Sequence, residues 1–182
     1  MSARKARAVF LDRDGVINRS PVRDGRPYPP ESLETFEILP GVAQTLEDLR
    51  AAGFLNIVVT NQPDVATGKQ RREVVEAMHE HIRSRLALDD IRACFCVEGP
   101  KCPCYKPKPG LLLEAAQDWR IDLEQSFMVG DRWRDVGAGQ AAGCRTIFID
   151  RGYREQRPDN PDFVVSDLPQ AGEIVLRFQV VK

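Results

Sequence analysis

Short apolar blocks alternate along the chain with longer segments in which apolar residues recur at a helical period. Blocks of consecutive apolar residues predict strands that are buried on both faces of a parallel sheet. Such strands are expected at residues 7–11, 54–59, 91–97, 126–129, 145–149 and 163–165. Apolar residues on one helical face predict helices at residues 41–52, 71–88, 110–119, 135–142 and 168–177. Gly53 and Gly143 are expected to end two of these helices.

Strands and helices alternate along the whole chain, with no internal repeat or low-complexity linker. This order predicts an α/β fold with an open, doubly wound, mostly parallel sheet. We expect one domain over residues 1–182, because no segment is long enough for a separate cap domain. Residues 13–40 are a long irregular stretch, and loops of this length in compact domains are usually functional or mobile.

In a doubly wound sheet, ligands bind outside the carboxyl ends of the strands, so polar residues at those ends are candidates for a site. They are Asp12, Asp14, Thr60, Asn61, Gly130 and Asp131. Carboxylates from Asp12, Asp14 and Asp131 would form a hard-oxygen site that suits Mg²⁺. Taken singly, each aspartate is equally well explained as a turn former or a helix cap.

Several common catalytic motifs are missing from the sequence. It contains no P-loop, no dinucleotide-binding glycine motif, and no serine or cysteine in a nucleophile elbow. His79 and His81 are two residues apart on an expected helix, so they do not share a face, and both are expected at the surface or rim. A carboxylate is the remaining candidate nucleophile, and aspartyl-phosphate chemistry is an established use of one.

Four of the five cysteines lie in one short loop, residues 94–104, as two Cys-x-Cys pairs. They are Cys94, Cys96, Cys102 and Cys104. Four thiolates this close together predict a tetrahedral zinc site with no open position, and therefore a structural one. The loop is rich in Gly and Pro, so a metal would supply order that hydrophobic packing does not. The alternative is four unrelated thiols or disulfide pairs. Cys144 is expected in the core.

The composition is that of a globular protein. Of the 182 residues, 42% are hydrophobic and 29% are charged, and the formal net charge is −1. This balance excludes a strongly basic nucleic-acid-binding protein, and no apolar run approaches the ~20 residues that span a bilayer. The apolar run after the basic N-terminus is too short for a signal peptide. We therefore expect a cytoplasmic protein with reduced cysteines and with neither a nucleic-acid nor a membrane partner.

The motifs at the strand ends resemble those of the haloacid dehalogenase superfamily. Residues 10–18 (Phe-Leu-Asp-Arg-Asp-Gly-Val-Ile-Asn) resemble its first motif, and residues 60–62 (Thr-Asn-Gln) resemble its second. Lys106 resembles the third, and residues 130–135 (Gly-Asp-Arg-Trp-Arg-Asp) resemble the fourth, all in the family's order. Together with Cys-x-Cys-x-Lys-Pro-x-Pro-Gly, they resemble the subgroup of heptose-1,7-bisphosphate 7-phosphatases and histidinol phosphatases.

The resemblance implies a Mg²⁺-dependent phosphomonoesterase that acts on a small sugar phosphate through an aspartyl-phosphate intermediate. Asp12 would be the nucleophile, and Asp14 would give a proton to the leaving alcohol and take one from water. Asp12, the Asp14 backbone carbonyl and Asp131 would hold Mg²⁺. Asp135 would cap the helix that follows or support the metal, and the cap is preferred because Asp is a favoured N-cap residue.

The resemblance also implies which residues bind the substrate. The Thr60 hydroxyl, the Asn61 backbone N–H and Lys106 would hold the phosphoryl oxygens. Tyr105 stands where relatives often have an Arg that helps to select the substrate, and Cys96 stands where they often have a His.

The resemblance points first to removal of the 7-phosphate from D-glycero-D-manno-heptose 1,7-bisphosphate. Its second phosphate needs a further anion site, for which Arg132 is the preferred residue. Basic residues in nearby loops are expected to be solvated surface charges: Arg19, Arg23, Arg26, Lys69 and Lys108.

Three alternatives to this reaction stay open. Histidinol phosphate has one phosphate and a cationic amine, and would prefer acidic neighbours. A phospho-accepting receiver domain of the signalling type also uses Asp, Thr and Lys at strand ends, but it is shorter and has an adjacent acidic pair. An interaction module built on the zinc loop would have no need for the complete set of strand-end residues.

Overall fold

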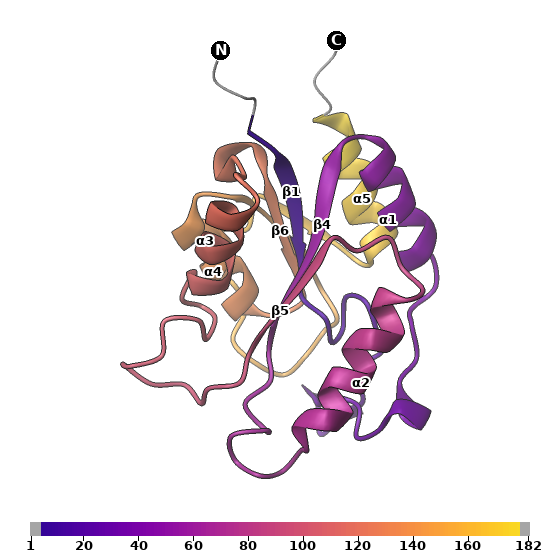
Figure 1. The fold of residues 1–182 in the computed structure, drawn as a ribbon, viewed down its shortest axis with the longest axis vertical. Coiled ribbons are helices and arrows are strands. Elements are labelled where there is room, and N and C mark those ends of the chain that lie inside the picture. The colour runs from indigo at the N-terminus through magenta and orange to yellow at the C-terminus, as the bar shows by residue number, and fades with distance from the viewer. Residues whose placement is uncertain (1–4, 179–182) are drawn as a thin grey trace.

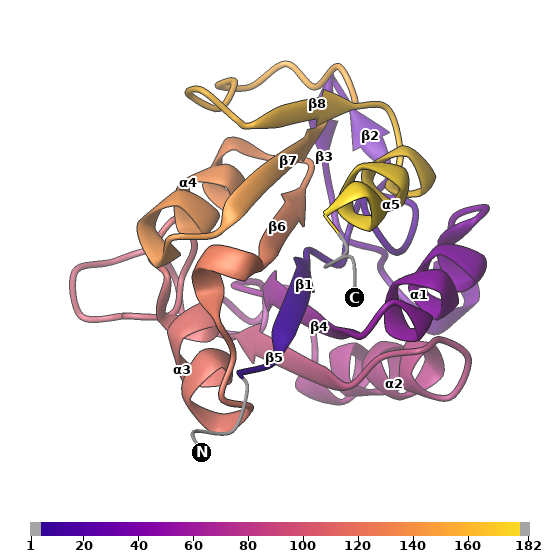
Figure 2. The ribbon, with the colours of Figure 1, turned by 90° about the horizontal axis from the view of Figure 1, so that it is seen from above.

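The computed structural model describes residues 5–178, which form one parallel sheet with helices on both faces (Figure 1, Figure 2). Its six strands lie in the order β5-β4-β1-β6-β7-β8, and every neighbouring pair is parallel. The strands are β1 Arg7–Leu11, β4 Phe54–Asn61, β5 Asp90–Cys94, β6 Phe127–Gly130, β7 Arg145–Ile149 and β8 Phe163–Val165. The chain reverses its direction of winding between β1 and β6, and ligands bind at such switch points.

Within residues 5–178, five α-helices cover the sheet (Figure 2). Those on one face are α1 Val42–Ala51, α2 Arg72–Arg83 and α5 Leu168–Arg177, and those on the other are α3 Gly110–Asp118 and α4 Trp133–Ala142. Alternate residues of β1 enter the two cores, Val9 and Leu11 on the first face and Ala8 and Phe10 on the second. Because both faces are buried, the strand sequence is apolar throughout, which confirms the predicted doubly wound sheet.

Two of the predicted elements are shorter than expected. The helix expected at residues 71–88 ends at Arg83, and Leu86 reaches the core from the turn that follows, so the apolar period outlasts the helix. The strand expected at residues 91–97 ends at Cys94, the last residue that pairs with β4, and the chain then turns into the cysteine loop.

The stretch at residues 13–40 is less irregular than expected. It contains a two-stranded antiparallel hairpin, β2 Val22–Arg23 and β3 Arg26–Pro27, and the 3₁₀ turn η1 Leu33–Thr35. A second 3₁₀ turn, η2 Leu123–Gln125, precedes β6. Among the helices of residues 5–178, none has both the length and the apolar character needed to cross a bilayer.

Candidate active site

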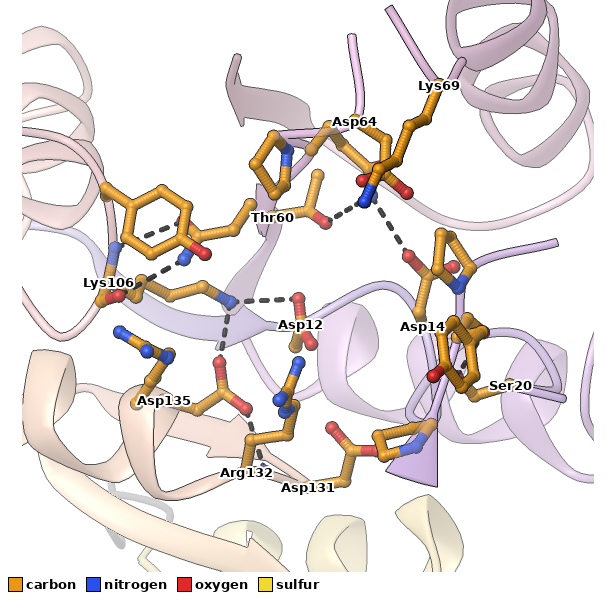
Figure 3. A pocket seen from close by; sticks show the side chains of 18 residues that line it. Asp12, Asp14, Ser20, Thr60, Asp64, Lys69, Lys106, Asp131, Arg132 and Asp135 are labelled. Carbon is orange, nitrogen blue, oxygen red and sulfur yellow. Dashed lines mark hydrogen bonds and ion pairs between the residues drawn. The ribbon is translucent and has the colours of Figure 1, made fainter. Parts of the chain in front are cut away.

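The carboxyl ends of β1, β4 and β6 open into a pocket of about 300 Å³ (Figure 3). All of the residues expected from the sequence to bind or convert a phosphate line it: Asp12, Asp14, Thr60, Asn61, Tyr105, Lys106, Asp131 and Arg132. The hairpin contributes Tyr28, and the segment after β4 contributes Asp64 and Lys69. The parallel sheet therefore brings together motifs that lie far apart in the sequence.

The centre of the site is the buried ammonium group of Lys106, whose side chain is only 2% exposed. It donates hydrogen bonds to Asp12 Oδ1 at 2.9 Å, to Asp135 Oδ1 at 2.6 Å and to the Val59 carbonyl at 2.8 Å. Burial alone would lower the pKa of Lys106, but the two carboxylates outweigh burial and raise its pKa. Lys106 is therefore protonated and positively charged, although it is buried.

Asp135 lies inside the first turn of α4, because the helix begins at Trp133, so it is not the N-cap residue preferred from the sequence. Its Oδ1 accepts from Lys106, and its Oδ2 accepts from the Arg132 backbone N–H at 3.0 Å, which closes the first turn of α4. A Cβ atom at Gly130 would lie 2.1 Å from Cβ of Asp135, so the glycine leaves the space that this carboxylate fills. The pairing of Asp135 with Lys106 was not predicted.

Three buried carboxylates lie together here, from Asp12, Asp131 and Asp135, with ligand atoms within 4.8 Å of one another, and two of them, Asp12 and Asp135, pair with Lys106. Three carboxylates against the one ammonium of Lys106 leave two negative charges without a partner, which matches a divalent cation. Within residues 5–178, the buried Oδ1 of Asp131 has no hydrogen-bond partner. The donor set is all oxygen, so it fits Mg²⁺.

The carboxylate of Asp14 is turned away from this group, contrary to the convergence expected from the sequence. Arg13 holds it through both oxygens at 3.1 and 2.9 Å, and Asn18 and Gln62 donate to it at 2.9 and 3.0 Å. Burial favours the neutral acid, but Arg13 and these hydrogen bonds lower the pKa of Asp14 below its usual value. Asp135, rather than the Asp14 side chain, is therefore the third carboxylate of the group.

Arg13 is fully buried, and this explains why the expectation for His79 is wrong. His79 is 8% exposed, and its Nε2 lies 3.1 Å from Nη1 of Arg13. Burial, and next the charge of Arg13, lower the pKa of His79 to about 4, so the neutral ring can accept a hydrogen bond from the guanidinium. The helical spacing of the histidines gave no sign of this contact.

Thr60 and Asn61 lie beside Lys106 at the end of β4. The Thr60 hydroxyl is buried and is 3.0 Å from Gln62 Nε2. The Asn61 side chain bonds to the main chain of Lys106 at both ends, accepting from its N–H at 3.1 Å and donating to its carbonyl at 3.2 Å. The asparagine amide therefore fixes the backbone that carries the lysine, a role that was not predicted.

Basic residues from the first turn of α4 face the pocket. Arg132 forms a two-pronged ion pair with Glu155 at 2.9 and 2.6 Å. Arg134 lies over the Tyr105 ring at 5.4 Å from its centroid and pairs with Glu98 at 2.8 Å. Arg134 also lines the pocket but was not predicted, although its spacing from Arg132 in the fourth motif was visible in the sequence.

The other basic residues considered from the sequence divide into two groups. Lys69 lines the pocket. Arg19 and Arg23 are exposed and pair with Glu37 and Glu31, and Lys108 donates to backbone carbonyls of the cysteine loop.

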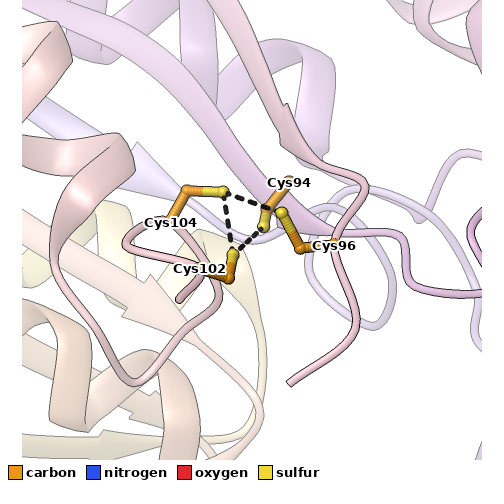
Figure 4. Close-up of side chains that lie close together, drawn as sticks. All are labelled: Cys94, Cys96, Cys102 and Cys104. Carbon is orange, nitrogen blue, oxygen red and sulfur yellow. Dashed lines mark hydrogen bonds between the residues drawn. The ribbon is translucent and has the colours of Figure 1, made fainter. Parts of the chain in front are cut away.

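The four cysteine sulfurs lie close together, so the beginning and the end of the loop meet there (Figure 4). Neighbouring Sγ atoms lie 3.5 Å (Cys94–Cys102), 3.4 Å (Cys102–Cys104) and 3.9 Å (Cys96–Cys104) apart. These distances are too long for a disulfide bond of about 2.05 Å. They are close to the ~3.8 Å between thiolates that share a tetrahedral zinc with bonds of about 2.3 Å. Cys144 is buried in the core, as expected.

Comparison with known proteins identifies the family. The D-glycero-beta-D-manno-heptose-1,7-bisphosphate 7-phosphatase of Rhodopseudomonas palustris is 37% identical over 90% of this chain and 91% of its own length. The chain belongs to the haloacid dehalogenase-like phosphatases, in the family of this enzyme. The Escherichia coli phosphatase of the same name is 34% identical over 93% of the chain and 95% of its own length. A HAD-hydrolase-like family model also matches residues 103–171 of the chain described here.

A solved structure agrees with the assignment of the chain as a phosphatase of this family. The D,D-heptose 1,7-bisphosphate phosphatase from B. bronchiseptica, complexed with magnesium and phosphate, superposes with a TM-score of 0.79 at 27% identity. The match covers 94% of this chain and 98% of that one. The family, the fold and the class of enzyme predicted from the motifs are therefore confirmed, and the receiver-domain alternative is wrong.

The carboxylate cluster predicts a pH-dependent response to magnesium. Burial, opposed by Lys106, raises the pKa of Asp12 from 3.8 to about 6, and burial with the charge of Asp12 raises the pKa of Asp131 well above its usual value. Protons compete with a cation for these oxygens, so Mg²⁺ should raise Tm more at about pH 8 than at about pH 5. Differential scanning fluorimetry at constant ionic strength measures both shifts.

Without Mg²⁺, a rise in pH should destabilise the folded protein. The folded pKa of Asp12 exceeds its value of 3.8 in the unfolded chain, so the folded state binds more protons. The free energy of unfolding should then fall as the pH rises from about 4 through about 6. An equal Tm shift by Mg²⁺ at both pH values would show that these carboxylates do not hold the cation.

Proposed function

We propose that this chain is one phosphatase domain that hydrolyses a small sugar phosphate through a phosphorylated Asp12. The observation that carries this proposal is the buried Lys106 ammonium, which is bonded to Asp12 at the carboxyl end of β1. A buried, charge-paired carboxylate at a switch point is placed to meet a phosphate rather than to form a turn. The most favoured substrate is D-glycero-D-manno-heptose 1,7-bisphosphate, losing its 7-phosphate, because relatives that match 90% and 93% of the chain are named for that reaction.

In this proposal Asp12 attacks phosphorus while Asp14 moves the proton. Arg13 keeps Asp14 ionised before substrate binds. A phosphate bound beside it adds negative charge, raises the pKa of Asp14 and allows it to carry the proton that the leaving alcohol requires. Asp14 then takes a proton from the water that hydrolyses the aspartyl-phosphate, and the fixed position given by Asn18 and Gln62 serves both steps.

Charge on the transferring phosphoryl group is balanced by groups already in place. Mg²⁺ held by Asp12, Asp131 and the Asp14 carbonyl would reduce the repulsion between carboxylate and phosphate. We assign the Thr60 hydroxyl, the Asn61 N–H and the Lys106 ammonium to the phosphoryl oxygens. The three N–H donors of Lys106 are used by Asp12, Asp135 and the Val59 carbonyl, so one of them, the donor to Asp12, would pass to a phosphoryl oxygen while Asp135 holds the ammonium in place.

The pocket also favours a substrate with two phosphates. Arg132, Arg134 and Lys69 line it beyond the carboxylates, and arginine can bond phosphate through two donors. Loops and the β2–β3 hairpin cover this edge within residues 5–178, and the volume of about 300 Å³ suits a small molecule. Asp64 also lines the pocket and would suit the amine of histidinol phosphate, which is therefore the second candidate.

The cysteine loop completes the proposal. We assign a structural zinc ion to Cys94, Cys96, Cys102 and Cys104, whose sulfurs have the separation that tetrahedral coordination requires. The loop leads directly into Tyr105 and Lys106, so its order sets the position of the lysine. We expect the enzyme to act in the cytoplasm, where the thiolates stay reduced.

The substrate is tested by comparing kcat/KM for the heptose bisphosphate and for histidinol phosphate. We expect the bisphosphate to be preferred, because three basic residues face the pocket. Arg132→Ala should raise KM for the bisphosphate about tenfold, since a charge-assisted hydrogen bond is lost, and should change KM for p-nitrophenyl phosphate little. Arg26→Ala removes an exposed arginine from the hairpin and serves as the matched control.

Either of two results would contradict this choice. A higher kcat/KM for histidinol phosphate would overturn the substrate. An unchanged KM for the bisphosphate in Arg132→Ala would remove this arginine from the substrate site.

The zinc site is tested with Cys102→Ser. The protein should carry about one zinc ion per chain by the four-ligand argument, and the variant should lose it. Its Tm should fall, and its kcat should drop on the order of 10- to 100-fold as Lys106 shifts. Cys144→Ser alters a buried cysteine outside the loop and should keep its zinc. Full activity in a zinc-free Cys102→Ser variant, measured by elemental analysis and steady-state kinetics, would refute the link between loop and lysine.

A further inference from the structure

The segment between β7 and β8 braces the active site, although nothing in the sequence marked it. Arg151 donates through Nε and Nη2 to the Gly15 carbonyl at 3.1 and 2.9 Å. Glu155 forms the ion pair with Arg132 that is described above. The segment therefore touches both turns that carry the carboxylates, the one after β1 and the one after β6.

Tyr153 makes the most direct of these contacts. Its hydroxyl donates a hydrogen bond to Asp131 Oδ2 at 2.8 Å. The other oxygen of this buried carboxylate, Oδ1, has no hydrogen-bond partner among residues 5–178. The two oxygens thus have different surroundings, one fixed by the tyrosine and one available to a cation.

Gly15 provides the space in which this pair fits. A Cβ atom there would lie 1.8 Å from Asp131 Oδ2 and 3.0 Å from the Tyr153 hydroxyl oxygen. The glycine also has φ of +85°, a conformation that side chains disfavour. The turn after β1, the end of β6 and the segment after β7 therefore meet at one carboxylate oxygen.

We propose that Tyr153 is a positioning residue for the metal ligand Asp131. Its hydrogen bond fixes the rotation of the carboxylate so that Oδ1 faces the cation position between Asp12 and Asp135. A neutral phenol donates one hydrogen bond and adds no charge, so it orients the ligand without competing for the cation. Groups that orient a metal ligand in this way typically change metal affinity by about 10- to 100-fold. This inference rests on the Mg²⁺ site of the proposed function.

The test is Tyr153→Phe, which keeps the ring and removes the hydroxyl. Isothermal titration calorimetry of the zinc-loaded, Mg²⁺-free variant with Mg²⁺ should give a Kd about tenfold higher than in the wild type. At saturating Mg²⁺, kcat should return to within about twofold of the wild-type value, because Asp131 is then held by the metal. Trp119→Phe removes an aromatic donor to a carboxylate outside the pocket, the N–H that bonds Asp90 Oδ2 at 3.0 Å, and should leave the Kd for Mg²⁺ unchanged.

The outcomes separate this inference from the function on which it rests. Equal Kd values for wild type and Tyr153→Phe overturn the positioning role while leaving the Mg²⁺ site intact. A lower kcat at saturating Mg²⁺ with an unchanged Kd also overturns it, since that is the pattern of a packing defect. Absence of Mg²⁺ binding by the wild type overturns the metal site itself, and the positioning role with it.

Discussion

The rest of the site depends on the burial of one positive charge. The Lys106 ammonium sits where it is 2% exposed, and removing such a charge from water costs several kcal/mol unless it is paired. Asp12 and Asp135 supply the pair, but with Asp131 they leave the cluster short of positive charge. A divalent cation would supply the two positive charges that the protein alone does not provide. The same contacts that stabilise the lysine thus favour a bound cation and hold Asp12, the proposed nucleophile, in place.

The fold meets this constraint from three directions. The parallel sheet places the ends of β1, β4 and β6 side by side, and the Asp12 N–H bonds to the Val129 carbonyl at 3.0 Å. The cysteine loop presents Lys106, whose backbone the Asn61 amide holds on both sides. The segment after β7 closes the third side through its contact with Asp131. Each of these is a long-range contact, so the site exists only when the whole sheet is assembled.

Sequence reasoning found what is local and missed what depends on packing. The strands, the winding of the sheet and the strand-end motifs follow from apolar periodicity and from the rule that ligands bind at carboxyl ends. Which way a side chain turns does not follow from them. The Asp14 carboxylate pairs with Arg13 instead of joining the carboxylate cluster, and Asp135 pairs with a lysine 29 residues away. His79 is buried because it accepts from an arginine at the end of a different element. Helical spacing and turn preferences cannot predict such contacts, because the partners come together only when the sheet is packed.

The claim that Asp12 becomes phosphorylated is tested most directly by trapping it. The enzyme is acid-quenched during turnover of a sugar phosphate with Mg²⁺, reduced with borohydride and digested for peptide mass spectrometry. An aspartyl-phosphate is reduced to homoserine, so the account predicts this change at position 12 in the wild type and its absence in Asp12→Asn, which should also be inactive. Reduction at another carboxylate, or turnover by Asp12→Asn at a rate near that of the wild type, would contradict it.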